Sequence, residues 1–540
     1  MKLLQVENLT LKADGRRVLD GVSFSVSQGE TFALVGESGS GKSLTSLAIM
    51  RLLPPSIEVC GGDVILEGQS LFMLPEYRMQ AIRGKKIAMI FQEPMSALNP
   101  VMRVGEQVAE VLKLHLRLSG SEAKERVYAL FDEVSLPDPE STYHRYPHQL
   151  SGGQKQRVMI AMALACEPDL LIADEPTTAL DVTVQAQVLA LLERIKRTRG
   201  LSILFITHDM AVVSQMADTI AVMKEGQIVE TADASRLFAA PSHPYTRRLL
   251  KDALGLSFSS RTKESVPLLE VEDLKIYFPI KKGLLQRTVG YVKAVDGVSL
   301  SIPKGRTLAL VGESGSGKST LGEAILSLVP ITEGSIRFNG VDLSTLSGYQ
   351  RRRYRQKIQV IFQDPFSALD PRMRIAEILR EGMESLGVGP QEREAQDVYL
   401  GELLEKVELD AAYLYRYAHE FSGGQRQRIG IARALAVKPE LIICDEPTSA
   451  LDVTVRAQVL TLLKRLQEET GVSYLFITHD LSIVPYIADE VAVMRQGKIV
   501  EQGSVKRVME TPAHPYTQTL LAAAPKLPHI TIKETYDHTV

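Results

Sequence analysis

The chain has no tryptophan and only three cysteines among its 540 residues. Cys60, Cys166 and Cys444 are far apart in sequence and show no CxxC spacing, so we expect no disulfide framework, zinc site or iron–sulfur cluster. Isolated thiols of this kind suit a reducing compartment.

Long apolar runs are also missing. The most apolar stretches, at 158–166 and 202–207, end well before the ~20 apolar residues that a membrane-spanning helix needs. The first residues, MKLLQVENLTLKADGRR, lack the apolar centre of a secretory signal. We therefore expect that no segment of this chain spans a membrane or directs export.

An excess of one sign of charge is absent as well. Lys and Arg number 62 against 65 Asp and Glu, and the formal net charge is -3. Proteins that bind nucleic acid usually carry a basic excess, so nucleic acid is not an expected partner. With 45% hydrophobic and 24% charged residues, the composition is that of a soluble globular protein.

What the chain does contain is a long internal repeat. LLQVENL at 3–9 returns as LLEVEDL at 268–274, and ALVGESGSGKS at 33–43 returns unchanged at 309–319. The repeat continues to the end of each half, so we predict two homologous domains fused in one chain. The predicted division is a first domain at 1–250, a Ser-containing linker at 251–267, a second domain at 268–525 and a loose tail at 526–540.

The spacing of matched residues shows where the halves differ. The second half carries extra residues around 279–292, and the first half carries extra residues near 54–62. We expect both to be surface loops, where insertions are tolerated.

Short apolar runs alternate with stretches of helical period in each half. TFALVG at 31–36 and DLLIAD at 169–174 are typical of parallel strands buried on both faces. The stretch at 105–133 and its counterpart at 375–407 have apolar residues at helical spacing throughout. These patterns predict an α/β core with a small helical subdomain inserted in each half.

A glycine-rich loop follows an apolar strand and precedes a helical run in each half, which is the context of a P-loop. Its backbone N–H groups can approach phosphates, its Lys can reach the β and γ phosphates, and its Ser hydroxyl can ligate Mg²⁺. The predicted ATP-binding residues are Gly36, Glu37, Ser38, Gly39, Ser40, Gly41, Lys42, Ser43 and Leu44, with Gly312, Glu313, Ser314, Gly315, Ser316, Gly317, Lys318, Ser319 and Thr320.

Paired acids end an apolar strand farther along each half. Asp174 and Glu175 follow LLIA, and Asp445 and Glu446 follow LIIC. Ligands of open α/β sheets bind at the carboxyl edge of the strands, where these acids are expected. We predict that each Asp helps to hold Mg²⁺ and that each Glu polarises the attacking water as the catalytic base.

LSGGQ at 150–154 and FSGGQ at 421–425 precede these strands, and with them the chain resembles the nucleotide-binding subunits of ABC transporters over nearly its whole length. The resemblance implies two tandem P-loop NTPase domains, each with a RecA-like α/β core, an antiparallel β part and a helical subdomain. It adds signature, Q-loop, D-loop and switch residues to the site, with the Q-loop Gln beside Ser and Asp as a Mg²⁺ ligand. These residues are Ser151, Gly152, Gly153, Gln154, Ser422, Gly423, Gly424 and Gln425 of the signatures, Gln92 and Gln363, Asp181 and Asp452, and His208 and His479.

The resemblance also implies that each ATP lies between the P-loop of one domain and the signature of the other. Two composite sites result, and both contain a catalytic Glu and a switch His, so we expect both to hydrolyse ATP. The family usually stacks adenine on an early aromatic residue, a role that suits Phe278, whereas Ala13 stands at the equivalent place of the first half. We therefore expect weaker ATP binding at the first P-loop.

PSHPYTRRLL at 241–250 and PAHPYTQTLL at 512–521 resemble the His-Pro-Tyr segment of ATPases that serve oligopeptide and dipeptide importers. The fusion of both ATPases most closely resembles the YejF-type subunit of peptide importers. Partners implied by this resemblance are two membrane-spanning permeases and an extracytoplasmic binding protein, with the chain held peripherally on the cytoplasmic face of the membrane only through the permeases. The segments 94–101 and 365–373 would contact the permeases. Many members of this branch hold an iron–sulfur cluster, which the cysteine pattern here does not predict.

Two other functions remain open at this point. A soluble tandem ABC protein that acts on the ribosome also needs no membrane segment, but the long charged linker and the basic excess of that class are missing here. An importer ATPase for another solute, such as sugar or nickel, is the nearer alternative. The sequence does not identify the cargo.

Overall fold

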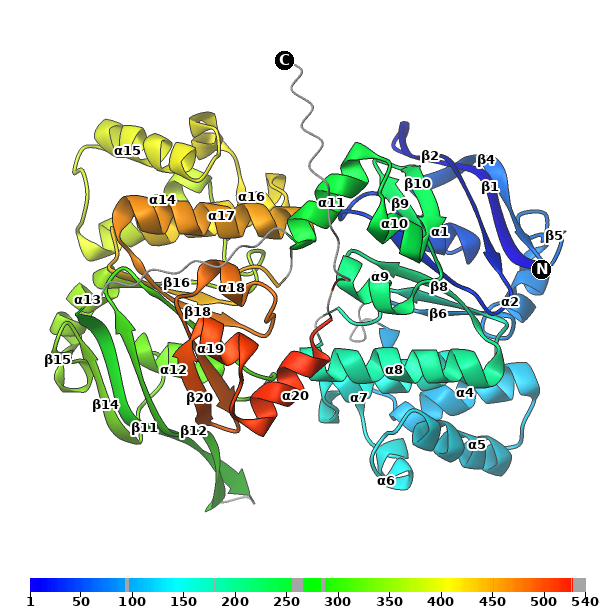
Figure 1. Cartoon of the computed structure of the whole chain (residues 1–540), viewed down its shortest axis with the longest axis horizontal. Helices are drawn as coiled ribbons and strands as arrows, with labels where there is room; N and C mark the ends of the chain where they lie inside the picture. Colours follow the sequence, from blue (N-terminus) through cyan, green and yellow to red (C-terminus); the bar gives the residue numbers. More distant parts are fainter. Residues whose placement is uncertain are drawn as a thin grey trace. The chain divides into compact units, whose positions relative to one another are not determined.

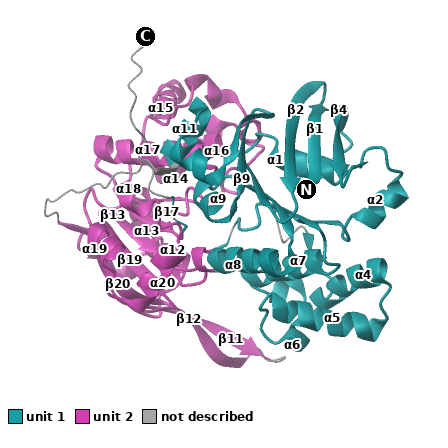
Figure 2. Cartoon of the chain, turned by 45° about the vertical axis from the view of Figure 1, so that its right-hand side comes forward, with its two compact units in different colours: residues 1–180, 184–254, 525–540 teal, residues 181–183, 255–524 magenta. Residues whose placement is uncertain are grey.

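The computed structural model describes residues 1–92, 97–178, 180–254, 266–282, 287–449, 451–525 and 527. The chain forms two compact units, one mainly of residues up to Leu254 and the other mainly of residues from Pro267 to Ala524 (Figure 2). Of the predicted linker, residues 255–265 lie outside the described part, as does nearly all of the predicted tail.

A six-stranded sheet is the centre of the first unit (Figure 1). Five neighbouring strands are parallel and β10 pairs antiparallel with β9 at one edge. Every residue of β3, β7 and β8 is buried, as expected for runs of apolar residues covered on both faces. In sheet order the strands are β10 (Gln227–Asp233), β9 (Thr219–Lys224), β3 (Thr31–Val35), β8 (Ser202–Thr207), β7 (Leu170–Asp174) and β6 (Ile87–Ile90).

A separate four-stranded antiparallel sheet completes the β part of this unit. Its buried apolar residues pack in one cluster with residues of β3, β7 and β8, so both sheets share a core. Its strands, in sheet order, are β2 (Arg16–Ser27), β1 (Lys2–Ala13), β4 (Ile57–Leu66) and β5 (Gln69–Ser70).

The helices of the first unit fall into two groups. Figure 1 shows α4, α5 and α6 gathered apart from β1, β2 and β4, and they pack on α7 to form the predicted helical subdomain. The helices are α1 (Lys42–Ile49), α2 (Glu76–Ile82), α4 (Val104–Leu116), α5 (Gly120–Glu133), α6 (Pro139–Tyr143), η1 (Pro147–Gln149), α7 (Gly152–Leu164), α8 (Val182–Arg199), α9 (Met210–Met216), α10 (Ala234–Ala239) and α11 (Pro244–Leu254).

The second unit repeats this architecture with the same strand orders. Its mixed sheet runs β16 (Ile358–Ile361), β17 (Leu441–Asp445), β18 (Ser473–Thr478), β13 (Thr307–Val311), β19 (Glu490–Arg495) and β20 (Lys498–Ser504), and its antiparallel sheet runs β12 (Arg287–Pro303), β11 (Pro267–Lys282), β14 (Glu333–Phe338) and β15 (Val341–Asp342). Its helices are α12 (Lys318–Ile325), η2 (Leu343–Thr345), α13 (Gly348–Lys357), α14 (Ile375–Leu386), α15 (Arg393–Lys406), η3 (Ala411–Tyr415), η4 (Ala418–Glu420), α16 (Gly423–Leu435), α17 (Val453–Thr470), α18 (Val484–Ile487), α19 (Val505–Glu510) and α20 (Pro515–Ala523).

The structure confirms the α/β core and the helical subdomains but corrects three local predictions. The predicted helical stretches are each broken into two helices, by Arg117 (φ 57°) in the first half and Gly387 (φ 69°) in the second, because a left-handed residue ends a helix. The residues around 279–292 are not simply a loop, because the described ones extend β11 and β12 in a hairpin. The residues near 54–62 likewise include the start of β4, from Ile57.

No helix in the described ranges is both long enough and apolar enough to cross a bilayer.

Candidate active site

The sheet topology brings the predicted site residues of each half to one edge. In the first half, the P-loop follows β3, His208 follows β8, Asp174 ends β7 with Glu175 directly after it, and Gln92 follows β6. These four strands are neighbours in the parallel sheet, in the order β3, β8, β7 and β6, so their carboxyl ends lie side by side. Segments that are far apart in sequence thus form one site.

The P-loop wraps tightly against a neighbouring hairpin. A Cβ atom added to Gly36 would lie 2.2 Å from the carbonyl oxygen of Met223 in β9, so only glycine fits there. Gly41 precedes α1 with a left-handed φ of 103°, which glycine adopts without strain. The first turn of α1 leaves N–H groups without helical partners beside this loop, which favours binding of a phosphate.

Lys42 is buried and directed back onto its own loop. Its Nζ donates to the carbonyl oxygens of Gly36, at 2.9 Å, and Glu37, at 2.8 Å. Its Nζ also contacts the Ser40 hydroxyl at 3.4 Å. A buried ammonium group at this position can exchange contacts with its own loop for stronger ones with phosphate oxygens.

Ser43 and Asp174 form an oxygen pair beside the P-loop. The Ser43 hydroxyl donates to Oδ1 of Asp174 at 3.1 Å. Burial, together with the negative charge of Glu175, raises the pKa of the Asp174 carboxyl to about 6, although the hydrogen bond from Ser43 and the charge of Lys42 act in the opposite direction. Mg²⁺ binds oxygen ligands such as a hydroxyl and a carboxylate, and a nearby cation would stabilise the ionised form of this carboxylate. These residues therefore fit the predicted metal.

Glu175 is the centre of a hydrogen-bond network that joins three loops. Gln92 Nε2 donates to its Oε2 at 3.0 Å, and His208 Nδ1 lies 3.1 Å from its Oε1. Thr178, which the sequence did not single out, also donates to Oε2, at 2.9 Å. Burial alone would raise the pKa of Glu175, but the hydrogen bonds from His208 and Thr178 and nearby positive charge lower it to about 2.

The backbone of Glu175 is itself unusual, with φ 47°, and the φ of Glu446 is 46°. A non-glycine residue in this left-handed region is strained, and such residues are concentrated at functional sites. The strained backbone directs each Glu side chain to the network after its strand has ended.

The second half contains the same Gln–Glu–His network, but Ser449, the counterpart of Thr178, donates to the backbone carbonyl of Glu446 and not to its carboxylate. Gln363 Nε2 donates to Glu446 at 2.8 Å, and His479 Nδ1 lies 2.9 Å from the other oxygen of that carboxylate. The Ser319 hydroxyl donates to Asp445 at 3.2 Å, and Lys318 donates to its own loop as Lys42 does. Burial raises the pKa of Asp445, and the bond from His479 outweighs burial to lower the pKa of Glu446.

The signature residues begin a helix in each half. Ser151 caps α7 by accepting from Gln154 N at 3.3 Å, and Ser422 caps α16 by accepting from Gln425 N at 3.4 Å. The ordinary capping role and the predicted phosphate-binding role are compatible, because a cap leaves other N–H groups of the first turn without helical partners.

The remaining predicted residues occupy other positions. Asp181 precedes α8 and accepts from the Thr183 hydroxyl at 2.8 Å, whereas Asp452 caps α17. Phe278 lies in β11 with 39% of its surface exposed, and Ala13 ends β1. Of the two segments predicted to contact permeases, residues 94–96 of the first lie outside the described part.

We define residues 243–246 and 514–517 as the HPYT segments. Each is bound at its start by a glutamate carboxylate that the sequence did not single out. Glu230 in β10 accepts hydrogen bonds from Ser242 N at 2.7 Å, Ser242 Oγ at 2.6 Å and His243 N at 3.0 Å. Burial would raise the pKa of Glu230, but these bonds lower it to about 2. Glu501 holds the second segment through the N–H groups of Ala513 and His514.

The Glu230 anchor predicts a pH-dependent contribution to stability. Because the folded-state pKa is about 2 and the ordinary value 4.5, the unfolded chain binds more protons between these pH values. We expect Glu230→Gln to lower the melting temperature by about 2 to 4 °C at pH 7, as loss of a charged hydrogen bond does. The difference in melting temperature between wild type and variant should shrink as pH falls from 4.5 towards 2. Thermal melts in dilute urea at several pH values measure this difference. A difference that does not change with pH would contradict the stabilising role of the ionised Glu230 carboxylate.

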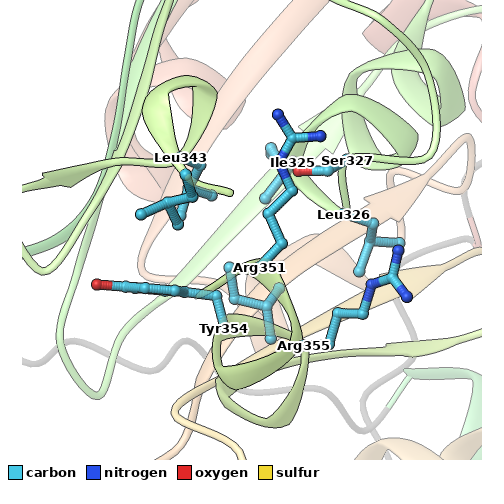
Figure 3. Close-up of a pocket in the computed structure, with 9 residues that line it drawn as sticks. Ile325, Leu326, Ser327, Leu343, Arg351, Tyr354 and Arg355 are labelled. Atoms are coloured by element: carbon cyan, nitrogen blue, oxygen red, sulfur yellow. The ribbon is translucent and has the colours of Figure 1, made fainter. Parts of the chain in front are cut away.

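A pocket of the second unit lies away from these residues (Figure 3). Its lining comes from the end of α12, from η2 and from α13, and includes Leu326, Leu343, Arg351, Tyr354 and Arg355. None of the predicted ATP-binding residues lines it. Among the described residues, no group of three or more His, Cys, Asp or Glu side chains forms a metal cluster, which is compatible with Mg²⁺ because it often takes only one or two carboxylates.

Two families match the chain, each of them twice. The family described as ABC transporter matches residues 19–178 and 295–449. The family described as oligopeptide/dipeptide transporter, C-terminal region, matches 229–271 and 500–537, which include the HPYT segments.

Curated relatives are similar over almost the whole chain. A protein of Agrobacterium fabrum named Peptidoglycan transport ATP-binding protein YejF is 48% identical over 510 residues, which are 94% of this chain and 92% of that protein. A protein of Salmonella choleraesuis named Glutathione import ATP-binding protein GsiA is 46% identical, over 96% of this chain and 88% of that protein. An uncharacterized ABC transporter ATP-binding protein of Escherichia coli, YejF, is 47% identical, over 96% and 99%.

Proposed function

This chain belongs to the family of ABC transporter ATP-binding proteins, and on that premise we propose that it hydrolyses ATP to power the import of peptides or peptide-like compounds. The observation that carries the ATPase is the Gln–Glu–His network beside a P-loop lysine and a Ser–Asp pair, present in both halves. The match of both HPYT segments to oligopeptide and dipeptide transporters supports the importer.

The proposed chemistry assigns a separate task to each group. Lys42 leaves its loop carbonyls to bind the β and γ phosphates, and P-loop N–H groups bind the same phosphates. Glu175, ionised at neutral pH, accepts a hydrogen bond from the attacking water, while Gln92 and His208 orient the carboxylate. Ser43, Asp174 and Gln92 would hold Mg²⁺, which would supply positive charge beside the phosphates.

The second site uses the equivalent set, with Lys318 on the phosphates and Glu446 on the water. Ser319, Asp445 and Gln363 are its proposed Mg²⁺ ligands. The first turns of α7 and α16 present N–H groups to a γ-phosphate. We also keep the predicted domain limits, 1–250 and 268–525, as part of the proposal.

The proposed cargo is a solute that contains peptide bonds. One relative is named for peptidoglycan transport, another for glutathione import and the third for no solute. The two solutes that are named both contain peptide bonds, but they are different compounds. The same comparison supports two permeases and an extracytoplasmic binding protein as partners, with this chain on the cytoplasmic side of the inner membrane and touching it only through the permeases. We propose no nucleic acid partner and no iron–sulfur cluster.

Co-purification tests this proposal without knowledge of the cargo. The chain is tagged at its native expression level, the membranes are solubilised gently, and bound proteins are identified with and without ATP. Stoichiometric recovery of two polytopic permeases is expected. Recovery of ribosomal particles in their place overturns the importer and supports a soluble ATPase that acts on the ribosome.

The aromatic residue in β11 leads to a prediction about unequal sites. Phe278→Ala should weaken ATP binding at the second site about tenfold, which is within the ~1 to 3 kcal/mol of a base–aromatic stack. Titration of a Lys42→Met chain, in which only the second site binds tightly, isolates this effect. Ala13→Phe in a Lys318→Met chain is the complementary gain-of-stacking variant. If Phe278→Ala leaves the affinity unchanged, adenine does not stack there.

A further inference from the structure

The HPYT segments have no role in the chemistry described above, yet both reach the P-loop of their own unit. The Tyr245 hydroxyl accepts a hydrogen bond from Glu37 N at 3.3 Å, across 208 residues of sequence. His243 caps the first turn of α11, because its Nδ1 accepts from Tyr245 N at 3.2 Å. The Glu230 carboxylate accepts hydrogen bonds from the N–H groups of Ser242 and His243. Tyr245 therefore lies in the first turn of a helix whose start is fixed by hydrogen bonds.

One peptide group of the P-loop is held at both of its ends. The carbonyl of the peptide between Gly36 and Glu37 accepts from Lys42 Nζ at 2.9 Å, and the N–H of the same peptide donates to Tyr245. Phosphate oxygens that bind the three N–H donors of the Lys42 ammonium would compete with this carbonyl. Tyr245 is then the contact that keeps this peptide in its orientation.

The hairpin of β9 and β10 joins the segment to the P-loop by a second route. Lys224 at the end of β9 lies 5.5 Å from the centre of the Tyr245 ring, in cation–π contact. Gly226 N, in the hairpin turn, donates to the P-loop carbonyl of Ser40 at 3.0 Å. The hairpin that carries Glu230 therefore also contacts the P-loop.

The second unit repeats every part of this arrangement. Glu313 N donates to the Tyr516 hydroxyl at 3.3 Å, and Lys318 Nζ donates to Gly312 O at 2.7 Å. The Arg495 guanidinium lies 4.7 Å from the centre of the Tyr516 ring, and His514 caps α20. Tyr516 is buried, with 6% of its surface exposed. The contact thus recurs in both halves, where the P-loop and the HPYT segment have the same residues.

We propose that Tyr245 and Tyr516 are positioning residues for ATP binding, which hold the P-loop peptide while the P-loop lysine moves to the phosphates. The inference rests on the proposed ATPase function and deepens it, because it links the segment that distinguishes this transporter branch to nucleotide occupancy. Without the hydroxyl, the Gly36–Glu37 peptide is free to turn once Lys42 leaves, and part of the binding energy is spent on ordering the loop. By linkage, bound nucleotide must in turn stabilise the HPYT segments.

The test uses the full chain with Tyr245→Phe and Tyr516→Phe, which keep the ring packing and the cation contacts and remove only the hydroxyls. Equilibrium binding of a fluorescent ATP analogue with Mg²⁺ should weaken about two- to tenfold, the range of one neutral hydrogen bond per site. Hydrogen exchange of the Glu37 and Glu313 amides should be faster in the variant without nucleotide. Tyr77→Phe and Tyr349→Phe, at tyrosines that are 68% and 80% exposed, are the matched control.

The outcomes separate this inference from the function on which it rests. Unchanged affinity in the Tyr245→Phe/Tyr516→Phe chain overturns the inference. A wild-type chain that binds no MgATP overturns the proposed function, and amide exchange at Glu37 and Glu313 then decides alone whether the tyrosines hold the loop. A lower melting temperature with unchanged affinity and exchange assigns the tyrosines to stability only and also overturns the inference.

Discussion

The Glu175→Gln/Glu446→Gln chain is expected to bind ATP but to hydrolyse it at about one-hundredth of the wild-type rate or less, the scale of a lost general base. The amide keeps the size of the carboxylate and can still meet His208, but it carries no negative charge to polarise the attacking water. Each single variant should lose the activity of its own site, because the Gln–Glu–His network is present in both halves.

Phosphate release at saturating MgATP measures this effect. Glu125→Gln and Glu394→Gln, at exposed glutamates of α5 and α15, are matched controls and should keep the wild-type rate. A Glu175→Gln chain that hydrolyses ATP at the wild-type rate would show that the first site contributes nothing.

Loss of the P-loop lysines should affect binding itself. Lys42→Met and Lys318→Met retain the apolar stem of a side chain that is only 5% exposed and remove its charge. We expect each to weaken ATP binding at its own site about ten- to hundredfold, since hydrogen bonds between charged groups are the strong ones. Calorimetric titration should then find one tight site in each single variant and none in the double variant.

Lys113→Ala and Lys406→Ala, at exposed lysines of α4 and α15, control for the loss of positive charge elsewhere. If the Lys42→Met chain still has two tight ATP sites, the first P-loop lysine does not contribute to ATP binding.

The core strands were predictable because their sequences are continuous apolar runs that stop at glycine or acidic residues. β3 and β7 occupy the predicted segments and are buried throughout. The β11–β12 hairpin was not predictable in the same way. β14 pairs with β11 only as far as Lys275, so the rest of β11 has one partner strand, and its largely exposed side chains impose no alternation that reveals a strand.

The break between α4 and α5 could not be predicted from the sequence either. The left-handed residue that ends α4 is Arg117, whereas glycine or asparagine usually marks such an ending. At the equivalent place of the second half the residue is Gly387, which the helical spacing on both sides obscured.

The network residues of the site could be predicted, because each belongs to a short motif at a strand end. Their hydrogen bonds could not, since Gln92 and Glu175 meet only when β6 and β7 pair. No sequence motif indicated the role of Glu230. Its carboxylate accepts hydrogen bonds from backbone N–H groups 12 and 13 residues along the chain, and every residue except proline has such a group. The contact between Tyr245 and the P-loop depends on the whole unit and has no local signal.

Peptide uptake by a reconstituted complex would show whether ATP hydrolysis in this chain powers import. The chain and the permeases recovered with it are placed in proteoliposomes, with MgATP on the side of the chain and the binding protein with a mixture of labelled peptides on the other. We expect peptides to cross only with ATP, and we expect no such movement with the Glu175→Gln/Glu446→Gln chain. Peptide movement that persists in that variant, or ATP hydrolysis that moves no peptide-like solute, would contradict this expectation.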